Sequence, residues 1–305
     1  MIRKILLVIL LLFILGTLGV FYIFSDKSES PLVLITDFGT KDGAVAAMKG
    51  VALKLAPELV IHDLTHEIPV FNVWEGAYRL QQTAPYWAPG TVFVGVIDPG
   101  VGTERKSIVL KTKANHYYVG PDNGLFTLVA ESEGIEEIRE ISSANRLPNS
   151  QNSYTFHGRD VFAYTGAKLA SGKMSFSEVG DLIPNKQLLM LQYAKPAFAS
   201  NIVTGGIPIL DIQYGNVWTN IDNKTFEKLG VKEGDMLTVK ILEKERIVFQ
   251  GLMPYVHTFG DVKEGDNLLY INSLLNLSIG INMDSFAKKY GVSSGADWRV
   301  EVSKL

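Results

Sequence analysis

The sequence predicts an α/β protein: a first domain on a largely parallel sheet, a smaller, mostly β second domain, and a transmembrane helix ahead of both. Three observations predict this fold class. Short apolar runs alternate with helix-patterned segments between residues 32 and 170, as in βαβ units. Beyond Pro184, short apolar runs are separated by glycines and charges. An uncharged, mostly apolar run covers residues 5–24.

The apolar run at residues 5–24 is long enough for a helix to cross a bilayer of ~30 Å. Arg3 and Lys4 precede it, so the positive-inside rule puts the following domains outside the cytoplasm. A cleaved signal peptide is the alternative, but the run exceeds the usual apolar core and no clear cleavage motif precedes Ser25. We therefore expect a membrane-anchored, extracytoplasmic catalytic domain, or a secreted one if the segment is cleaved.

The chain of 305 residues, 47% of them hydrophobic, suits two domains with sizeable cores. Its net charge of −3 and lack of a long basic run argue against nucleic acid as a partner. The absence of cysteine excludes disulfides, thiol catalysis and Cys-ligated zinc. We expect an anchor and linker at residues 1–30, an α/β catalytic domain at 31–190 and a β domain at 191–305.

The first domain's elements follow from apolar pattern and turn residues. We expect strands at residues 32–36, 60–64 and 92–97 and helices at 44–55 and 74–83. A hairpin at 108–119, a tight turn at 121–124 and a helix at 160–170 complete this domain. In the second domain the expected strands are short: 202–203, 206–212, 236–242, 246–249 and 267–271.

Acidic residues end three of the expected parallel strands: Asp37, Asp63 and Asp98. The carboxyl ends of parallel strands share one edge of the sheet, where ligands bind, so these carboxylates are expected to line one cleft. Gly100 and Gly102 follow Asp98 and permit backbone angles suited to close approach of a ligand. The alternative is that each Asp caps a helix or stabilises a turn.

Histidines and acids cluster at residues 62–67, which raises the possibility of a metal-dependent hydrolase using His62, Asp63, His66 and Asp37. The spacing argues against it, because a zincin requires His-Glu-x-x-His on a helix and here Pro69 follows instead. A hydrogen-bonded loop histidine is the simpler interpretation.

A second cluster at residues 155–160 contains His157, Arg159 and Asp160. Asp160 can simply cap the helix that follows, and Arg159 can simply pair with a carboxylate. A neutral His157 beside a buried Asp–Arg pair could position or deprotonate a water molecule.

Residues 211–220 bring an acid, amides, a tyrosine and a tryptophan together, a set able to stack on a flat base and bond its edge. An ordinary aromatic strand and turn is the alternative.

These segments resemble the S-adenosyl-L-methionine (SAM) hydrolase family, also called SAM hydroxide adenosyltransferases, which is related to the fluorinases and chlorinases. The resemblance extends over residues 34–302. It is carried by Thr36-Asp37-Phe38-Gly39, Asp63-Leu64-Thr65-His66, Val96-Ile97-Asp98-Pro99-Gly100-Val101-Gly102-Thr103, Pro121-Asp122-Asn123-Gly124, Thr155-Phe156-His157-Gly158-Arg159-Asp160 and Tyr214-Gly215-Asn216-Val217-Trp218-Thr219-Asn220.

The resemblance implies a Rossmann-like α/β domain followed by a small β-barrel, assembled as a homotrimer with active sites between subunits. It implies that water attacks the ribose 5′ carbon of SAM, releasing adenosine and L-methionine without a metal or other cofactor. Asp98, Arg105 and His157 would activate the water. A non-catalytic nucleoside-binding protein stays open as an alternative.

The resemblance also implies substrate contacts on the first domain. Asp37 would hold the ribose hydroxyls, with Phe71 and Phe156 as apolar walls. In the halogenase branch, a tyrosine matches Asp98 and a halide-binding serine matches Gly158. Neither is present here, which makes a SAM-dependent halogenase a poor second choice.

The remaining substrate contacts implied by the resemblance fall on the second domain. Asp211 would meet the methionine ammonium and Ser273 its carboxylate. Tyr214 would stack on the adenine while Asn216 bonds its edge. Leu274 departs from the family, which commonly has a polar residue or glycine after this serine.

Overall fold

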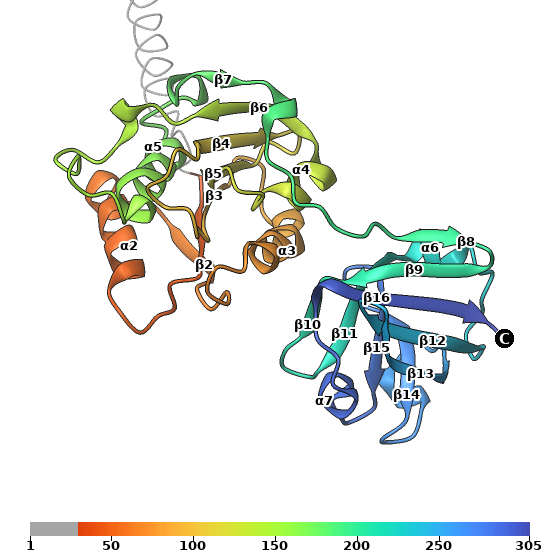
Figure 1. The fold of residues 1–305 in the computed structure, drawn as a ribbon. Helices are drawn as coiled ribbons and strands as arrows, with labels where there is room; N and C mark the ends of the chain where they lie inside the picture. Colours follow the sequence, from red (N-terminus) through yellow and green to blue (C-terminus); the bar gives the residue numbers. More distant parts are fainter. Residues whose placement is uncertain (1–29) are drawn as a thin grey trace, which may run out of the picture.

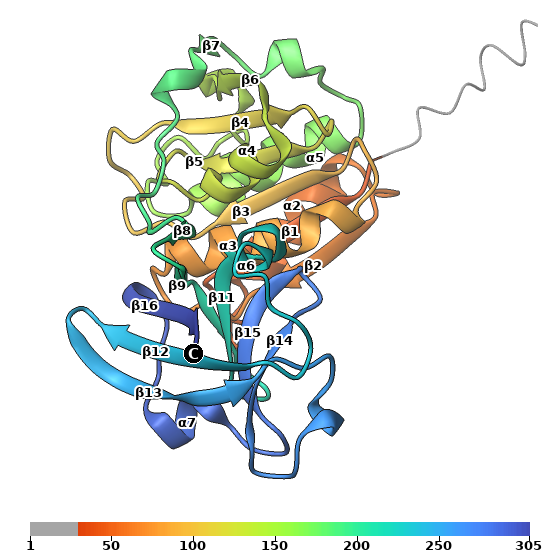
Figure 2. The ribbon, with the colours of Figure 1, turned by 90° about the vertical axis from the view of Figure 1, so that its right-hand side faces the viewer.

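The computed structural model describes residues 30–305, which form two parts joined by a connecting segment at residues 184–196 that begins with a short 3₁₀ turn and then continues without helix or strand (Figure 1). Residues 32–183 build a seven-stranded sheet with helices, and residues 197–304 build two smaller sheets. The two parts lie one beyond the other in both ribbon views (Figures 1 and 2).

The large sheet has the strand order β2-β1-β3-β5-β4-β6-β7. Its strands are β1 (Leu32–Thr36), β2 (Ile61–Thr65), β3 (Val92–Val96), β4 (Ser107–Thr112), β5 (Tyr117–Pro121), β6 (Ile135–Glu140) and β7 (Leu182–Ile183). Pairing from β2 through β5 is parallel, whereas β4 pairs antiparallel with β5 and β6, and β6 with β7. The sheet is therefore mixed, and the expectation of a largely parallel sheet is wrong for its second half.

Helices cover both faces of this sheet. Alternate strand residues face opposite sides, so Leu32 and Leu34 pack in one apolar cluster and Val33 and Ile35 in another. The first cluster is completed by α2 (Ala44–Leu55), a π-helical turn η3 (Gly158–Ala163) and α5 (Tyr164–Ala170). The second is completed by α3 (Val73–Thr83) and α4 (Thr127–Glu133). Three layers result.

The second part consists of a four-stranded sheet, β10-β11-β15-β14, and a five-stranded sheet, β13-β12-β16-β9-β8. Their elements are β8 (Ala197–Ala199), β9 (Ile202–Ile207), β10 (Ile209–Asp211), β11 (Asn216–Asp222), α6 (Asn223–Glu227), β12 (Met236–Glu243), β13 (Arg246–Pro254), β14 (Asn267–Ile271), β15 (Asn276–Ile281), α7 (Phe286–Tyr290) and β16 (Gly295–Lys304). Both sheets contribute to one apolar core that includes Ile221, Val239, Ile279 and Val300. The strand pairing thus gives two packed sheets where a β-barrel was expected.

Short 3₁₀ turns lie in the connections between these elements. They are η1 (Ala84–Tyr86), η2 (Ser143–Asn145), η4 (Phe176–Glu178), η5 (Asn185–Gln187) and η6 (Phe259–Asp261).

The transmembrane helix in the expected fold class requires correction. No helix among residues 30–305 is long and apolar enough to cross a membrane. Helix α2, for example, has 12 residues and reaches only ~18 Å, against a hydrocarbon layer of ~30 Å. Residues 5–24, where the span was expected, lie outside the described residues. The fold is mixed α/β with several sheets, and the expectation of a membrane-anchored, extracytoplasmic or secreted catalytic domain, which depended on that helix, is withdrawn.

Candidate functional site

Asp98 and Arg105 form a buried ion pair just beyond the end of β3. Arg105 donates from Nη1 to Asp98 Oδ1 and from Nη2 to Asp98 Oδ2, the latter over 2.7 Å. The Gly100 N–H also donates to Asp98 Oδ1 at 3.1 Å. Only 4% of the Asp98 side chain and 13% of the Arg105 side chain are exposed. Burial raises the pKa of Asp98, and the charge of Arg105 and the Gly100 N–H oppose that rise.

Glycines allow the loop to wrap around this ion pair. A Cβ at Gly100 would lie 3.2 Å from Arg105 Nη1. Gly102 has a φ of +79°, and a Cβ there would lie 2.9 Å from the carbonyl oxygen of Tyr154. The loop therefore contacts the segment that leads to His157.

His157 stands at the start of η3, close enough to Asp98 for each to shift the pKa of the other. Burial lowers the pKa of His157; the positive charges of Arg146 and Arg105 lower it further, while Asp98 and Asp160 raise it. The net shift is downward, so the imidazole is held neutral. Its Nδ1 atom is buried and has no hydrogen-bond partner among the described residues.

Arg159 pairs with a carboxylate, as the simpler sequence interpretation allowed, and that carboxylate is Asp160. Arg159 donates from Nε and Nη2 to the two Asp160 oxygens at 2.7 and 3.1 Å, and Asp160 is fully buried. The cluster at residues 155–160 thus leaves His157 as the side chain available for chemistry.

The first-domain residues expected around the ribose are linked by contacts. Asp37 Oδ2 accepts a hydrogen bond from the Phe71 N–H at 2.8 Å. The neighbouring ring of Phe38 meets Phe156 edge-on, with centroids 5.9 Å apart. A Cβ at Gly158 would lie 3.2 Å from the Phe38 ring, so this corner is tightly packed. The chain of contacts connects Asp37 to the residue before His157.

The histidines at residues 62–67 make hydrogen bonds and ring contacts with neighbouring side chains. His66 Nδ1 shares a 2.8 Å hydrogen bond with Thr36 Oγ1, and its Nε2 lies 3.0 Å from Asp63 Oδ1. His62 packs edge-on against the Trp87 ring. Within residues 30–305, no group of three His, Asp or Glu side chains is placed to hold a metal ion. The metal-hydrolase alternative therefore lacks a ligand set in this part of the chain.

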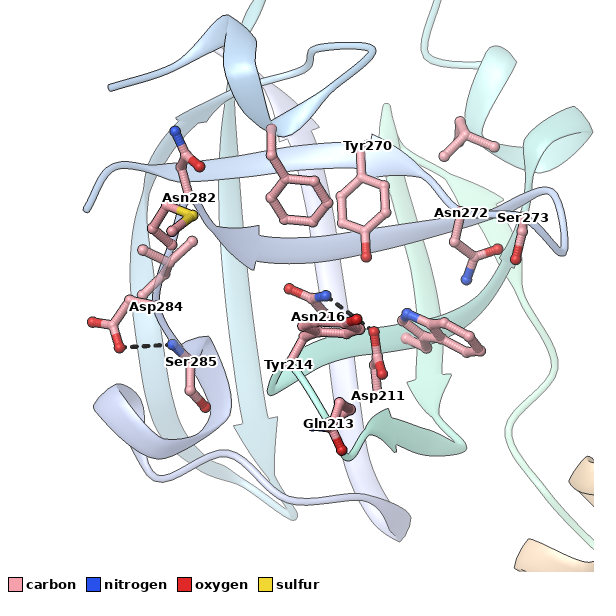
Figure 3. Close-up of a pocket in the computed structure, with 15 residues that line it drawn as sticks. Asp211, Gln213, Tyr214, Asn216, Tyr270, Asn272, Ser273, Asn282, Asp284 and Ser285 are labelled. Atoms are coloured by element: carbon pink, nitrogen blue, oxygen red, sulfur yellow. Dashed lines mark hydrogen bonds between the residues drawn. The ribbon is translucent and has the colours of Figure 1, made fainter. Parts of the chain in front are cut away.

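The second part carries a pocket of about 810 Å³ (Figure 3). Asn216 donates from Nδ2 to Asp211 Oδ2 at 3.1 Å, and Tyr214 is 68% exposed. Tyr270 also lines the pocket, where burial raises its pKa to about 12. The full lining is Asp211, Gln213, Tyr214, Asn216, Trp218, Phe259, Tyr270, Ile271, Asn272, Ser273, Ile281, Asn282, Met283, Asp284 and Ser285. The four second-domain residues expected to bind substrate thus line one pocket.

Several lining residues were missed at the sequence level. Phe259 and Tyr270 add two aromatic rings whose centroids lie 4.9 Å apart, and Asp284 adds a second carboxylate. Asp284 follows β15, which pairs with β11, so the pairing of these strands would have been the signal. The pocket's lining includes carboxylates but no Lys, Arg or His, which suits a cationic ligand.

The structure does not bring all expected site residues together within one chain. The pocket is lined only by residues from 211 to 285. Asp98, Arg105 and His157, together with Asp37, Phe71 and Phe156, belong to the loops of the large sheet and line no part of it. Two separate constellations result.

Two family models match this chain, one on each of its two parts. Residues 32–180 match the SAM hydroxide adenosyltransferase N-terminal domain, and residues 205–299 match its C-terminal domain. The chain is 38% identical over 268 residues to the (R)-S-adenosyl-L-methionine hydrolase of Methanocaldococcus jannaschii, covering 86% of this chain and 92% of that protein. It is 30% identical over 288 residues to a fluorinase from an Actinoplanes species, covering 87% and 95%.

A solved structure agrees. The crystal structure of an uncharacterized conserved protein from Thermotoga maritima superimposes with a TM-score of 0.82 at 36% identity, covering 90% of this chain and 100% of that one. The similarity to these relatives, in fold and in sequence, covers nearly all of the described residues, and the two domains come in the same order. The chain belongs to the SAM hydroxide adenosyltransferase family.

Proposed function

We propose that this protein hydrolyses SAM to adenosine and L-methionine. The observation that carries the proposal is the buried Asp98–Arg105 pair with His157 close enough for their charges to interact, its pKa lowered by burial and by Arg146. Relatives named (R)-S-adenosyl-L-methionine hydrolase, 31–38% identical over most of the chain, support the same reaction.

In the proposed reaction, a water oxygen forms a bond to the ribose 5′ carbon while the bond from that carbon to sulfur breaks. The sulfur keeps the electron pair and leaves as the neutral thioether of methionine. Since a sulfonium is already a good leaving group, the protein's task is to hold, desolvate and deprotonate the water.

His157 is the proposed base, because a neutral imidazole can accept the proton that the water loses. Asp98 holds the water and stabilises the imidazolium that forms. Arg105 keeps Asp98 ionised despite its burial, since a buried carboxylate is costly unless it is paired. Arg105 Nε is buried without a partner among the described residues and can bond to the same water.

Substrate binding divides between the two constellations. We propose that Asp37 holds the ribose hydroxyls, with the rings of Phe71 and Phe156 beside the ribose and sulfonium. On the pocket side, Asp211 meets the methionine ammonium and Ser273 its carboxylate.

The adenine belongs at the aromatic part of the pocket. Tyr214 stacks on the base, and Asn216 bonds its edge. The planar, apolar lining contributed by Phe259 and Tyr270 is consistent with a bound purine.

We propose that the active site forms between copies of the chain, as in a homotrimer, with the domains divided near residue 190 into 31–190 and 191–305. The separation of the two constellations supports this, as do apolar side chains exposed near each: Phe71 at 65% and Met283 at 80%. Sedimentation equilibrium tests it, and a strictly monomeric, fully active protein would contradict it.

Two alternative functions predict different outcomes when the protein is given SAM. Tight packing of the Phe38 ring against Gly158 leaves little room for the serine of a halogenase, so halide transfer is disfavoured. A non-catalytic nucleoside-binding protein would bind adenosine in calorimetry without converting SAM.

The experiment incubates purified protein with SAM and separates the products by chromatography. We expect adenosine and methionine in equal amounts, in chelator-treated as in untreated protein, and loss of both in Asp98→Ala. If adenosine does not exceed the uncatalysed control, the proposed function is wrong. A 5′-halogenated adenosine made in the presence of halide would favour the halogenase instead.

A further inference from the structure

Arg146 lies outside the motifs discussed so far, immediately after η2, and its side chain ties down a loop. Its Nε donates to the Ser150 hydroxyl and carbonyl oxygens at 3.0 and 3.2 Å, and its Nη2 donates to the Ser150 carbonyl at 2.9 Å. The same Nη2 also donates to the Ser153 carbonyl. One guanidinium therefore holds both ends of the turn at residues 150–153.

The same guanidinium faces the buried Asp160. Its Nη2 lies 3.9 Å from Asp160 Oδ2, and the backbone N–H of Leu147 donates to the Asp160 carbonyl at 2.8 Å. Arg146 thus fixes Ser153 on one side and lies against Asp160 on the other. His157 sits in the short segment between these two points, so its position depends on how far apart they are held.

We propose that Arg146 is a positioning residue for His157: it anchors the Ser153 end of the segment that carries the imidazole, lies against Asp160 at the other end, and places a permanent positive charge near the ring. The proposal rests on the proposed function, in which His157 takes a proton from the attacking water. Arg146 itself contacts no reacting atom.

The charges around His157 support the electrostatic part of this role. The leading ones among the described residues are Arg146 and Arg105, which are positive, and Asp98 and Asp160, which are negative. After burial, Arg146 is the largest influence on the pKa of His157, and it lowers that pKa. Removing its charge raises the pKa, so more of the imidazole is protonated at mildly acidic pH and unable to accept a proton.

Arg159 offers a matched control. It carries the same charge and pairs with the same carboxylate, Asp160, yet it is not among the leading influences on the pKa of His157. In Arg146→Gln and in Arg159→Gln alike, Asp160 keeps one arginine nearby. A difference between the two variants therefore reports on His157 and not on general loss of charge.

The test is an NMR titration of His157 in the full-length protein without substrate, with the signal assigned by its loss in His157→Gln. We expect the pKa of His157 to rise in Arg146→Gln, to rise less in Arg159→Gln, and to stay near the wild-type value in Arg146→Lys, which keeps the charge. An unchanged pKa in Arg146→Gln, or an equal rise in Arg159→Gln, would overturn the electrostatic role.

The positional role is tested by kinetics. Arg146→Lys keeps the charge but loses the planar fork, so we expect kcat to fall about 10- to 100-fold with little change in KM. Wild-type kcat in Arg146→Lys would refute positioning, and this variant also serves if Arg146→Gln does not fold. If the wild-type protein releases no adenosine, the proposed function fails, while the substrate-free titration still decides the influence of Arg146 on His157.

Discussion

Asp98→Asn is the substitution that most sharply separates catalysis from simple binding. It preserves the size of the side chain but removes the negative charge that faces Arg105. Because Asp98 is 4% exposed, solvent does little to replace that charge. The amide also presents N–H groups or a neutral oxygen to the guanidinium, so the bidentate pair is lost.

The expected magnitude follows from what the carboxylate does. Asp98 belongs to the set of groups that orients and deprotonates the water, and loss of one such group lowers the rate by ~10²–10⁴-fold, or ~3–5.6 kcal/mol at about 1.4 kcal/mol per tenfold. Leaving a buried charge unpaired also destabilises the fold by roughly 3–5 kcal/mol. We therefore expect a large fall in kcat together with a lower melting temperature.

The assay is the initial rate of adenosine release at saturating SAM, measured by chromatography at a temperature where circular dichroism shows the variant folded. Glu140→Gln is the control, because it breaks a neighbouring ion pair that is largely exposed: the side chain of Lys106 is 42% exposed and that of Glu140 is 44% exposed. That variant should keep the wild-type rate. A folded Asp98→Asn protein within about threefold of wild type would refute the assigned role, since loss of a group that holds the water and supports its base lowers the rate far more.

The remaining predictions concern binding and stability. Asp211→Asn should raise KM for SAM by about 10- to 100-fold with a smaller effect on kcat, because a charged hydrogen bond to the substrate ammonium is lost; an unchanged KM would exclude that contact. Burial would raise the pKa of Glu133, but hydrogen bonds led by His116 hold it below its ordinary 4.5, so its stabilisation fades as pH falls below that value. Burial would lower the pKa of His116, yet Glu133 raises it above its ordinary 6.5, so its stabilisation is complete below 6.5 and fades at higher pH. Denaturant titrations should therefore show the largest loss of stability in Glu133→Gln between about pH 5 and 6, and a pH-independent loss would contradict the pairing. Gly166→Ala should destabilise the protein by ~1–3 kcal/mol, because the added Cβ would overlap a side chain of β3. Gly50→Ala is the control: there is open space around Gly50, so this helix substitution should leave stability unchanged or raise it. Differential scanning calorimetry of the two variants measures both effects.

The first part of the fold was largely predictable because its local signals agree. The helix expected at Ala44–Leu55 has those bounds, and the second begins at Val73, one residue early, where Asn72 accepts a hydrogen bond from the Glu75 N–H. The expected hairpin at 108–119 is observed as β4 and β5. Strongly apolar strands and clear turn residues leave few alternatives.

Elements that depend on distant partners were not predictable in the same way. The half-polar strand β6 (Ile135–Glu140) was missed, since its pairing with β4 decides its conformation. The helix expected at residues 160–170 begins as a π-helical turn, next to the buried pairing of Asp160 with Arg159. Helical spacing of apolar residues alone does not report such a π-helical turn.

The candidate site was likewise predictable only where its residues lie in recognisable motifs. Asp98 and Arg105 were expected together and are hydrogen-bonded, and Asp211 and Asn216 share one pocket. The role of Arg146 had no signal in the sequence, because it acts through carbonyl oxygens of a loop whose course is not encoded by any motif. The separation of the two constellations is also a property of the three-dimensional arrangement alone.

The most direct test of the central claim is SAM turnover by the purified protein in water enriched in ¹⁸O. Attack of water at the ribose 5′ carbon predicts one ¹⁸O atom in the 5′ hydroxyl of adenosine and none in methionine, measured by mass spectrometry. Absence of adenosine, or adenosine without the label, would contradict the account.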